Sequence, residues 1–494
     1  MKTNPVRSKV TPARKTHGGA PGAVPQAEEQ LLRLVASCML YEKTFYESGD
    51  SVVKNIAETL DSVSPEYAAK VAIMAREDFK LRHVPLFLLS QLAYRASKRK
   101  KTLPAGVLSN SLARVIQRAD ELAEFLAIHA KVNGVKPDKI KKIMSAQIKQ
   151  GLAQAFTKFD AYRLAKYNRD NAIKLRDVLF LCHAKPKDKA QANLWKKLVE
   201  GTLASPDTWE VALSGGADKK LTFERLLADN KLGDLALLRN LRNMKQAGVP
   251  ASMIKRAIAD AKFTRVLPFR FIAAAKYAPE FEDALGEAMV RSMIADAGSL
   301  SGRTLLVVDI SGSMHAGLSG KSEMTRLDAA CGLAMLIREV CEEPVIYATA
   351  GNDWKSKHAT DIVPPRHAFA LRDAILKLNS TLGQGGIFLK QCIEYIDCME
   401  SEKFDRVIVI TDEQDCDNRS GISAAARNTA LLGKHNYILN VAPYKVGLDT
   451  GEKWVRFNGF SERVVDFIRW FETKETPGQF ERKLAVGASV EDDE

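Results

Sequence analysis

With 494 residues, 46% of them hydrophobic and 27% charged, the chain is too long for one compact core and has the composition of a folded protein of two or more domains. No apolar run approaches the roughly 20 residues of a membrane-spanning helix, and residues 1–17 lack the apolar segment of a secretory signal, so we expect a cytoplasmic protein. Seven scattered cysteines without a Cys-x-x-Cys pair indicate reduced thiols and argue against a disulfide framework or a zinc site.

The formal net charge of +13 is unevenly distributed along the chain. Residues 1–300 hold 50 Lys and Arg against 31 Asp and Glu, whereas residues 301–494 hold 23 against 29 and end in an acidic tail at 491–494. The first part would therefore attract a phosphate-bearing partner and the second would tend to repel it. We expect the two parts to have different roles.

The first three hundred residues are predicted to be helical. Residues 1–26, rich in Pro, Gly, Lys and Arg, predict a flexible basic arm without a fold of its own. Residues 27–300 are a series of amphipathic stretches, which predicts stacked helical hairpins of the HEAT or armadillo kind, although no fixed internal period is present. The expected helices include residues 28–41, 52–60, 65–77, 85–97, 108–131, 137–149, 164–168, 175–182, 189–200, 209–213, 222–229, 232–246, 251–261, 268–276 and 281–295.

A different pattern begins at Arg303. Continuous β-branched runs at 304–310, 345–349, 406–411 and 437–441 predict buried parallel strands. Amphipathic stretches at 325–341, 368–379, 388–399 and 423–432 predict helices between them. Residues 301–494 are thus expected to form a doubly wound, Rossmann-like α/β domain that binds ligands at the carboxyl ends of its strands, followed by a C-terminal segment with the acidic tail.

Oxygen-bearing side chains follow two of the predicted strands. Asp309, Ser311 and Ser313 come at the end of the first strand, and Asp412 ends another strand at the same edge. Carboxylates and hydroxyls in this arrangement are the hard ligands that Mg²⁺ prefers, so they form a candidate metal site. The competing interpretation is a turn in which Asp309 and Ser311 cap the following backbone.

This motif resembles the metal-ion-dependent adhesion site of von Willebrand factor A domains. In that family Asp-x-Ser-x-Ser is joined by an Asp after a later strand, which Asp309, Ser311, Ser313 and Asp412 match. The family also supplies a Thr from a Gly-Gly-Thr loop, and here Ile387 occupies that position. The resemblance implies Mg²⁺ as the cofactor, held with water or with a ligand from Ser380, Thr381 or Gln384 in place of the threonine.

Two sequence motifs typical of enzymes are incomplete or absent. The segment 315–322 ends in Gly-Lys-Ser, as a P-loop does, but His315 replaces the first glycine and no strand runs directly into it. The Gly-x-Ser-x-Gly elbow of serine hydrolases is absent from the sequence. The chain is therefore expected not to be an enzyme.

Basic residues of the helical part occur in clusters at 98–101, 136–149 and 166–189. Any one cluster is more often a solvated helix face, but several of them in a strongly basic region favour contact with a phosphate backbone. Arg239 and Asn240 are either RNA contacts or hydrogen-bonding residues between hairpins.

Several segments of this part resemble the TROVE module of the Ro family, and the order of TROVE followed by von Willebrand factor A also matches that family. The segments are 40–50, 80–86, 166–169, 175–186, 237–241 and 248–249. The resemblance implies a ring of helical hairpins whose outer surface holds small structured Y RNAs and whose lumen takes single-stranded ends of misfolded RNAs. It further implies a monomer that hands RNA to an exoribonuclease such as polynucleotide phosphorylase.

In the Ro family the segment matching 166–185 faces RNA. The residues expected to bind RNA are accordingly Lys166, Arg169, Lys174, Arg176, His183 and Lys185, together with Lys139 and Lys142. Unpaired bases stack on aromatic or imidazole rings while phosphates pair with Lys and Arg. For His183 a helix-terminal histidine bonded to its own backbone is an equally good interpretation.

The leading hypothesis is a non-enzymatic RNA-binding scaffold acting in RNA quality control or decay. One alternative is a metal-dependent protein-binding module of the adhesion type displayed on a helical scaffold, but such a module has no need of the basic excess. A second alternative, a metal-dependent nuclease, needs paired cations near the basic surface, whereas Asp309 and Asp412 belong to the acidic part.

Overall fold

A computed structural model describes the protein over most of its length. The described residues are 14–15, 21–23, 26–36, 49–77, 81–98, 102–168, 170–263, 266, 268–297, 299–318, 324–417, 433–442, 447–448, 454–458 and 464–472. They form two compact units. One is helical and begins at Ala27; the other is an α/β unit that includes Ser299–Leu318 and Thr325–Asn458.

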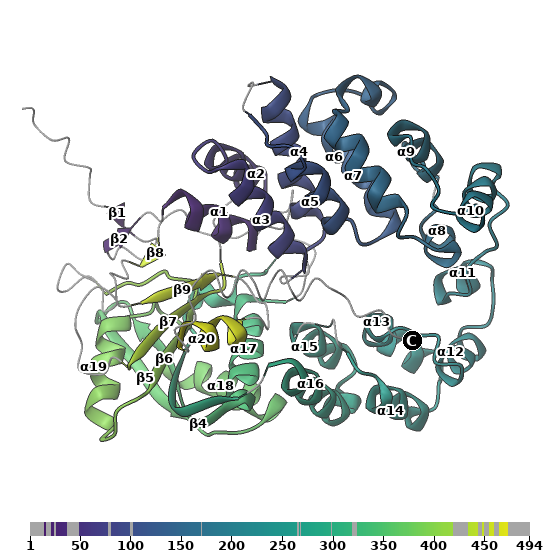
Figure 1. Ribbon diagram of the computed structural model, residues 1–494. Helices are drawn as coiled ribbons and strands as arrows, with labels where there is room; N and C mark the ends of the chain where they lie inside the picture. Colours follow the sequence, from purple (N-terminus) through teal and green to yellow (C-terminus); the bar gives the residue numbers. More distant parts are fainter. Residues whose placement is uncertain are drawn as a thin grey trace, which may run out of the picture. The chain divides into compact units, whose positions relative to one another are not determined.

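The helical unit contains short helices that follow one another in chain order (Figure 1). Its helices are α1 (Ala27–Ala36), α2 (Gly49–Thr59), α3 (Pro65–Glu77), α4 (His83–Lys98), α5 (Val107–Val115), α6 (Ala119–Val132), the 3-10 helix η1 (Pro137–Ile143), α7 (Ala146–Phe156), α8 (Ala161–Tyr167), α9 (Leu175–Cys182), α10 (Lys189–Glu200), α11 (Trp209–Ser214), α12 (Lys219–Ala228), α13 (Asp234–Gln246), α14 (Ala251–Asp260), α15 (Pro268–Tyr277), the 3-10 helix η2 (Pro279–Phe281) and α16 (Glu282–Ala297).

Each helix of this unit tends to pack against the helix two places further along the chain. The series α1, α3, α5, α7 and α9 shows this pattern, as do α12 with α14 and α13 with α15. Such stacking buries one apolar face per helix in a shared core, which runs without interruption from Leu31 to Leu198. The prediction of helical-repeat packing is confirmed.

Two expected helices are divided in the structure. The helix expected at 108–131 ends at Val115 because Ile116 turns to an extended conformation (φ −76°, ψ 104°). A new helix begins at Ala119, where the Glu121 carboxylate accepts the backbone N–H groups of Gln117 and Arg118 at 2.9 and 3.0 Å. Residues 137–149 form η1 and then α7, whose first turn is capped by Ser145.

The α/β unit contains a six-stranded sheet in the order β5-β4-β3-β6-β7-β9. The strands are β3 (Leu300–Asp309), β4 (Cys341–Asn352), β5 (Lys357–Val363), β6 (Arg406–Thr411), β7 (His435–Asn440) and β9 (Val455–Asn458). All neighbouring pairs are parallel except β4 and β5. The four predicted strands are present, while β5 and β9 were not expected.

Helices cover both faces of this sheet. They are η3 (Gly312–His315), α17 (Arg326–Val340), α18 (Ala368–Leu382) and α19 (Leu389–Met399). Leu389 and Ile393 of α19 pack on the face that carries Leu305 and Val307, and α17 and α18 lie on the other side (Figure 1). The doubly wound α/β fold is confirmed. The helix expected at 423–432 and the acidic tail lie outside the described residues.

A small sheet and one more helix complete the described elements. Within the expected basic arm, β1 (Arg14–Lys15) and β2 (Pro21–Ala23) form a small antiparallel sheet with β8 (Gly447–Leu448), and most other residues of 1–26 lie outside the described residues. One further helix is α20 (Val464–Glu472). The described cysteines have free thiols. Within the described part of the chain, no helix is both long and apolar enough to span a membrane.

Candidate nucleic-acid interface and metal centre

The helical unit contains a large open cavity of about 1170 Å³. It is lined by α6, α8, α11 and α13 together with the loops that precede them. Arg118 and Asp120 reach it from the start of α6, Trp209 from the start of α11, and Arg239 from α13. Residues more than 150 positions apart in the sequence thus surround one space.

Aromatic rings and cations alternate on the α8 side of this cavity. The guanidinium carbon of Arg118 lies 4.5 Å from the ring centre of Tyr167. Lys166 Nζ lies 5.6 Å from the ring centre of Tyr162 and 5.9 Å from that of Tyr167. Tyr162 is 48% exposed, so its ring is open to a further partner. This arrangement suits bases that stack and phosphates that pair with cations.

The cations around the cavity differ in how firmly they are held by carboxylates. Arg82 bonds Asp120 Oδ2 at 2.6 Å and also contacts Glu124, and Arg118 bonds Asp120 at 2.9 Å. Lys166 and Arg239 form no ion pair with any described carboxylate. Their charges are therefore the ones available for a phosphate.

A buried ion pair positions the start of α6 beside this cavity. Arg76 Nη2 bonds Glu121 Oε1 at 2.7 Å, with the side chain of Glu121 fully buried. Burial raises the pKa of Glu121, and the positive charge of Arg76 opposes that shift. Because the same carboxylate caps α6, this ion pair fixes the direction from which Arg118 enters the cavity.

The metal-site motif gathers at the carboxyl ends of β3 and β6. Ser311 Oγ lies 3.2 Å from Ser313 Oγ, and Ser313 is hydrogen-bonded to Asp412. Asp309 Oδ1 accepts the backbone N–H of Ser311 at 2.8 Å, and Asp309 Oδ2 accepts the hydroxyl of Thr411 at 2.7 Å. The turn-capping bond is thus present beside the clustered oxygens, and the donor set fits a hard cation.

The charge of this cluster is partly balanced by an arginine. Arg326 Nη1, on the buried first turn of α17, donates to Asp412 Oδ2 at 2.9 Å. Burial and the neighbouring Asp412 raise the pKa of Asp309 to about 7. Among the described residues, no group of three or more His, Cys, Asp or Glu side chains is arranged to hold a metal ion, so a cation here would depend on the hydroxyls of Ser311 and Ser313.

The loop that supplies threonine in adhesion sites lies in place, but Ile387 at the threonine position offers no ligand atom. The N–H of Gly312 donates to the carbonyl of Gly385 at 3.2 Å, so the loop touches the Asp309 turn. The side chain of Ile387 is buried in the core with Leu305 and Val307. Ser380 and Thr381 donate their hydroxyls to carbonyls of their own helix, α18, and these bonds do not involve the Asp309 cluster.

Comparisons with known proteins give matches in both the helical unit and the α/β unit. The model of the TROVE domain family matches residues 200–357. The crystal structure of the Ro (RSR) protein of Deinococcus radiodurans has 18% sequence identity and a TM-score of 0.54, and the match covers 90% of this chain and 99% of that chain. The family model thus covers about a third of the chain, and the chain shares its fold with the Ro protein of Deinococcus radiodurans. The two matches support an RNA-binding protein of the Ro type.

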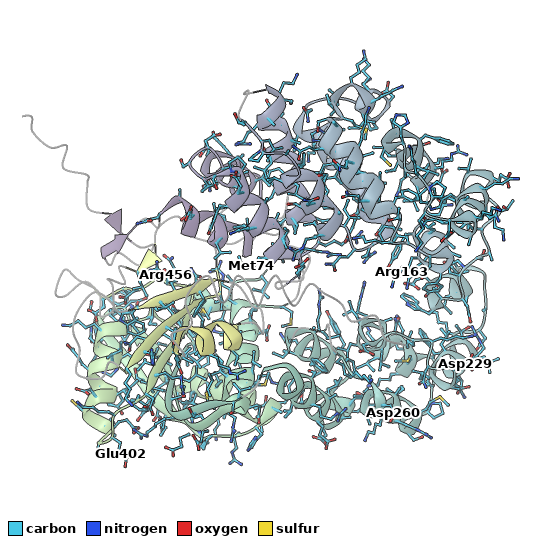
Figure 2. The ribbon with its side chains drawn as sticks, viewed as in Figure 1. Met74, Arg163, Asp229, Asp260, Glu402 and Arg456 are labelled. Atoms are coloured by element: carbon cyan, nitrogen blue, oxygen red, sulfur yellow. The ribbon has the colours of Figure 1, made fainter. Side chains whose placement is uncertain are left out.

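The residues expected to bind RNA do not all meet at the cavity. Lys166 lines it, one turn after Arg163, which is labelled in Figure 2. Arg169 lies outside the described residues. Five others are on the surface away from the cavity lining, where they keep water-exposed charge: Lys139, Lys142, Lys174, Arg176 and Lys185.

Some of these surface residues have nearby carboxylates or special backbone geometry. Lys174 pairs with Asp170 at 2.5 Å and Arg176 lies 3.9 Å from Asp177, so both charges are shared. His183 ends α9 in the left-handed conformation (φ 54°), and its ring is exposed. Asn240 bonds the carbonyl of Ala236 within α13, which corrects the idea of a bond between hairpins.

The TROVE match includes cavity residues that the sequence patterns did not single out. Trp209 lies within residues 200–357 and lines the cavity. Arg82 and Tyr162 also line the cavity but lie outside that range. The sequence signal of Tyr162 and Trp209 is weak because each is a single aromatic residue at the start of a helix, whereas Arg82 lies in the TROVE-like segment 80–86 beside other basic residues. The Thr208 side chain caps α11 and fixes where Trp209 projects.

Proposed function

We propose that the large cavity of the helical unit binds single-stranded RNA. The observation that carries the proposal is the placement of Lys166 between the rings of Tyr162 and Tyr167, with Arg118 stacked on Tyr167. Bases would stack on the exposed rings, and phosphates would pair with Lys166 and Arg239, which have no described carboxylate partner.

Structured RNA would bind elsewhere on the same unit. The exposed cations of η1 have no aromatic residue among them, which suits the regular backbone of a duplex better than splayed bases. We propose a Y-like RNA as that ligand and the free ends of misfolded RNA as the ligand of the cavity. The protein would then serve as a cytoplasmic, monomeric, non-enzymatic scaffold in RNA quality control, handing RNA to an exoribonuclease.

For the α/β unit we propose a weak Mg²⁺ site. Asp309, Ser311, Ser313 and Asp412 would hold the ion, which would supply a point of attachment for an acidic group of another molecule. Asp412 is already paired with Arg326, and Ile387 adds no ligand, so affinity should be lower than in a complete adhesion site.

Crosslinking tests the RNA proposal directly. A short oligouridylate containing 4-thiouridine, irradiated with the full-length protein at low salt, should crosslink to peptides containing Tyr162, Tyr167 and Trp209, because these rings line the cavity. The same oligonucleotide annealed to its complement is the control and should lose these crosslinks. Crosslinks confined to the α/β unit would refute the proposal.

A further inference from the structure

A second, smaller cavity of about 310 Å³ lies between α13 and α15. Its size is at the low end of the range for small-ligand pockets and matches one nucleotide rather than a stretch of chain. The residues that matter to its chemistry are Arg239, Arg242, Arg270, Leu235 and Tyr277. Three guanidinium groups therefore share one small space.

This cavity has an excess of positive charge. Of the described residues that line it, none is acidic. Arg239 and Arg242 form no ion pair with a described carboxylate, whereas Lys245 of the same helix is held by Glu280 at 2.7 Å. Loss of hydration around its guanidinium and the charge of Arg239 both lower the pKa of Arg270. Clustered like charges of this kind favour a bound anion.

An aromatic ring stands beside the guanidinium groups. Tyr277 is 42% exposed, and the guanidinium carbon of Arg242 lies 5.9 Å from its ring centre. Leu235, also 42% exposed, adds an apolar surface. A ligand that joins a strong anion to a flat ring would use both parts, and a nucleotide has this chemistry.

The two cavities are adjoining, because Leu235 and Arg239 line both. A strand lying in the larger cavity could therefore extend its end into the smaller one. An internal phosphodiester carries a single negative charge, whereas a terminal monophosphate carries about −1.5 to −2 near neutral pH, as phosphorylated side chains do. Three arginines match the more highly charged terminal group.

We propose that the cavity between α13 and α15 binds the phosphorylated terminal nucleotide of an RNA strand held in the larger cavity. The terminal phosphate contacts Arg239, Arg242 and Arg270, and the terminal base or ribose lies against Tyr277. The proposal rests on the proposed single-stranded RNA site. It adds selection for the chemistry of the strand end.

Three otherwise identical oligoribonucleotides test this inference: one with a 5′-phosphate, one with a 3′-phosphate and one with hydroxyl groups at both ends. The full-length protein should bind one phosphorylated form about tenfold more tightly than the unphosphorylated form, the effect of roughly one charge-assisted hydrogen bond. Arg242→Gln should reduce this preference several-fold, and it should lower the affinity for the unphosphorylated form no more than the control variant does, because Arg242 lines only the smaller cavity.

Lys245→Ala is the matched control, since it removes a positive charge from the same helix outside both cavities and should keep the preference. Equal affinity of the wild-type protein for all three oligonucleotides would overturn the inference and leave the RNA site standing. Failure to bind any of them would overturn both. A free nucleoside monophosphate that competes as well as the phosphorylated oligonucleotide would also overturn it, by assigning the cavity to a small ligand.

Discussion

The clearest perturbation of the proposed RNA site is the double substitution Lys166→Ala and Arg239→Ala. Both side chains line the large cavity, and neither is paired with a described carboxylate, so each is expected to contact one phosphate. For single-stranded nucleic acid each such contact contributes about 0.7 to the slope of log K against log salt. Loss of two contacts should flatten the slope by about 1.4, which amounts to roughly 25-fold in affinity at about 0.1 M salt and almost nothing near 1 M.

Fluorescence anisotropy of a labelled single-stranded oligoribonucleotide across a salt series measures both quantities. The matched control is Lys196→Ala with Arg256→Ala, which removes the same charge from exposed residues paired with Glu200 and Asp260, outside the cavity lining. Salt screens the interaction of such exposed charges with RNA bound in the cavity, so the salt slope of the control should stay close to that of the wild type. If the two double variants had the same slope, the placement of RNA in this cavity would be wrong.

Three other predictions concern stability and the metal site. Asp309→Ala should abolish any Mg²⁺-dependent rise in Tm yet leave RNA affinity within about twofold, since the RNA cavity belongs to the helical unit; parallel loss of RNA binding in a folded variant would contradict this. Arg326→Met should lower the free energy of unfolding by about 3–5 kcal/mol in denaturant titrations, because it leaves the Asp412 carboxylate buried without this partner, and adding Asp412→Asn should restore most of the loss. Burial lowers the pKa of His129, so below about pH 6.5 this histidine takes up a proton in the unfolded chain but not in the folded protein. The free energy of unfolding should therefore fall as the pH drops below that value. His129→Gln should reduce this pH dependence in thermal unfolding.

The central strands could be predicted because both of their faces are buried. Residues 305–308 and 407–410 are continuous apolar runs, as strands covered by helices on both sides require. The edge strand β5 has only two buried positions, Thr360 and Val363, and contains His358 and Asp361, so no continuous apolar run marks it. Antiparallel pairing with β4 is set by the turn at 353–356 and by register, which local composition does not encode.

The metal-site residues were predictable because they are close in sequence and each follows a strand. The cavity residues were not, because Arg82, Tyr162 and Trp209 come from different hairpins and meet only through the stacking of helices. Lys166 could be predicted as an RNA contact because its segment resembles the TROVE module of the Ro family. Its isolation from carboxylates, which makes it a good phosphate ligand, became visible only when the positions of Asp120 and Glu124 beside Arg82 and Arg118 were known.

The burial of Ile387 has a consequence for which amino-acid substitutions this α/β unit can tolerate. Its side chain is packed against Leu305 and Val307, so Ile387→Thr would place a hydroxyl in an apolar core and remove a methyl group, a loss of about 2 kcal/mol. A single substitution toward a complete adhesion site would thus destabilise the sheet before any ion could compensate. Packing in the core therefore favours isoleucine at this position, and a complete metal site could form only if neighbouring core residues changed together with Ile387.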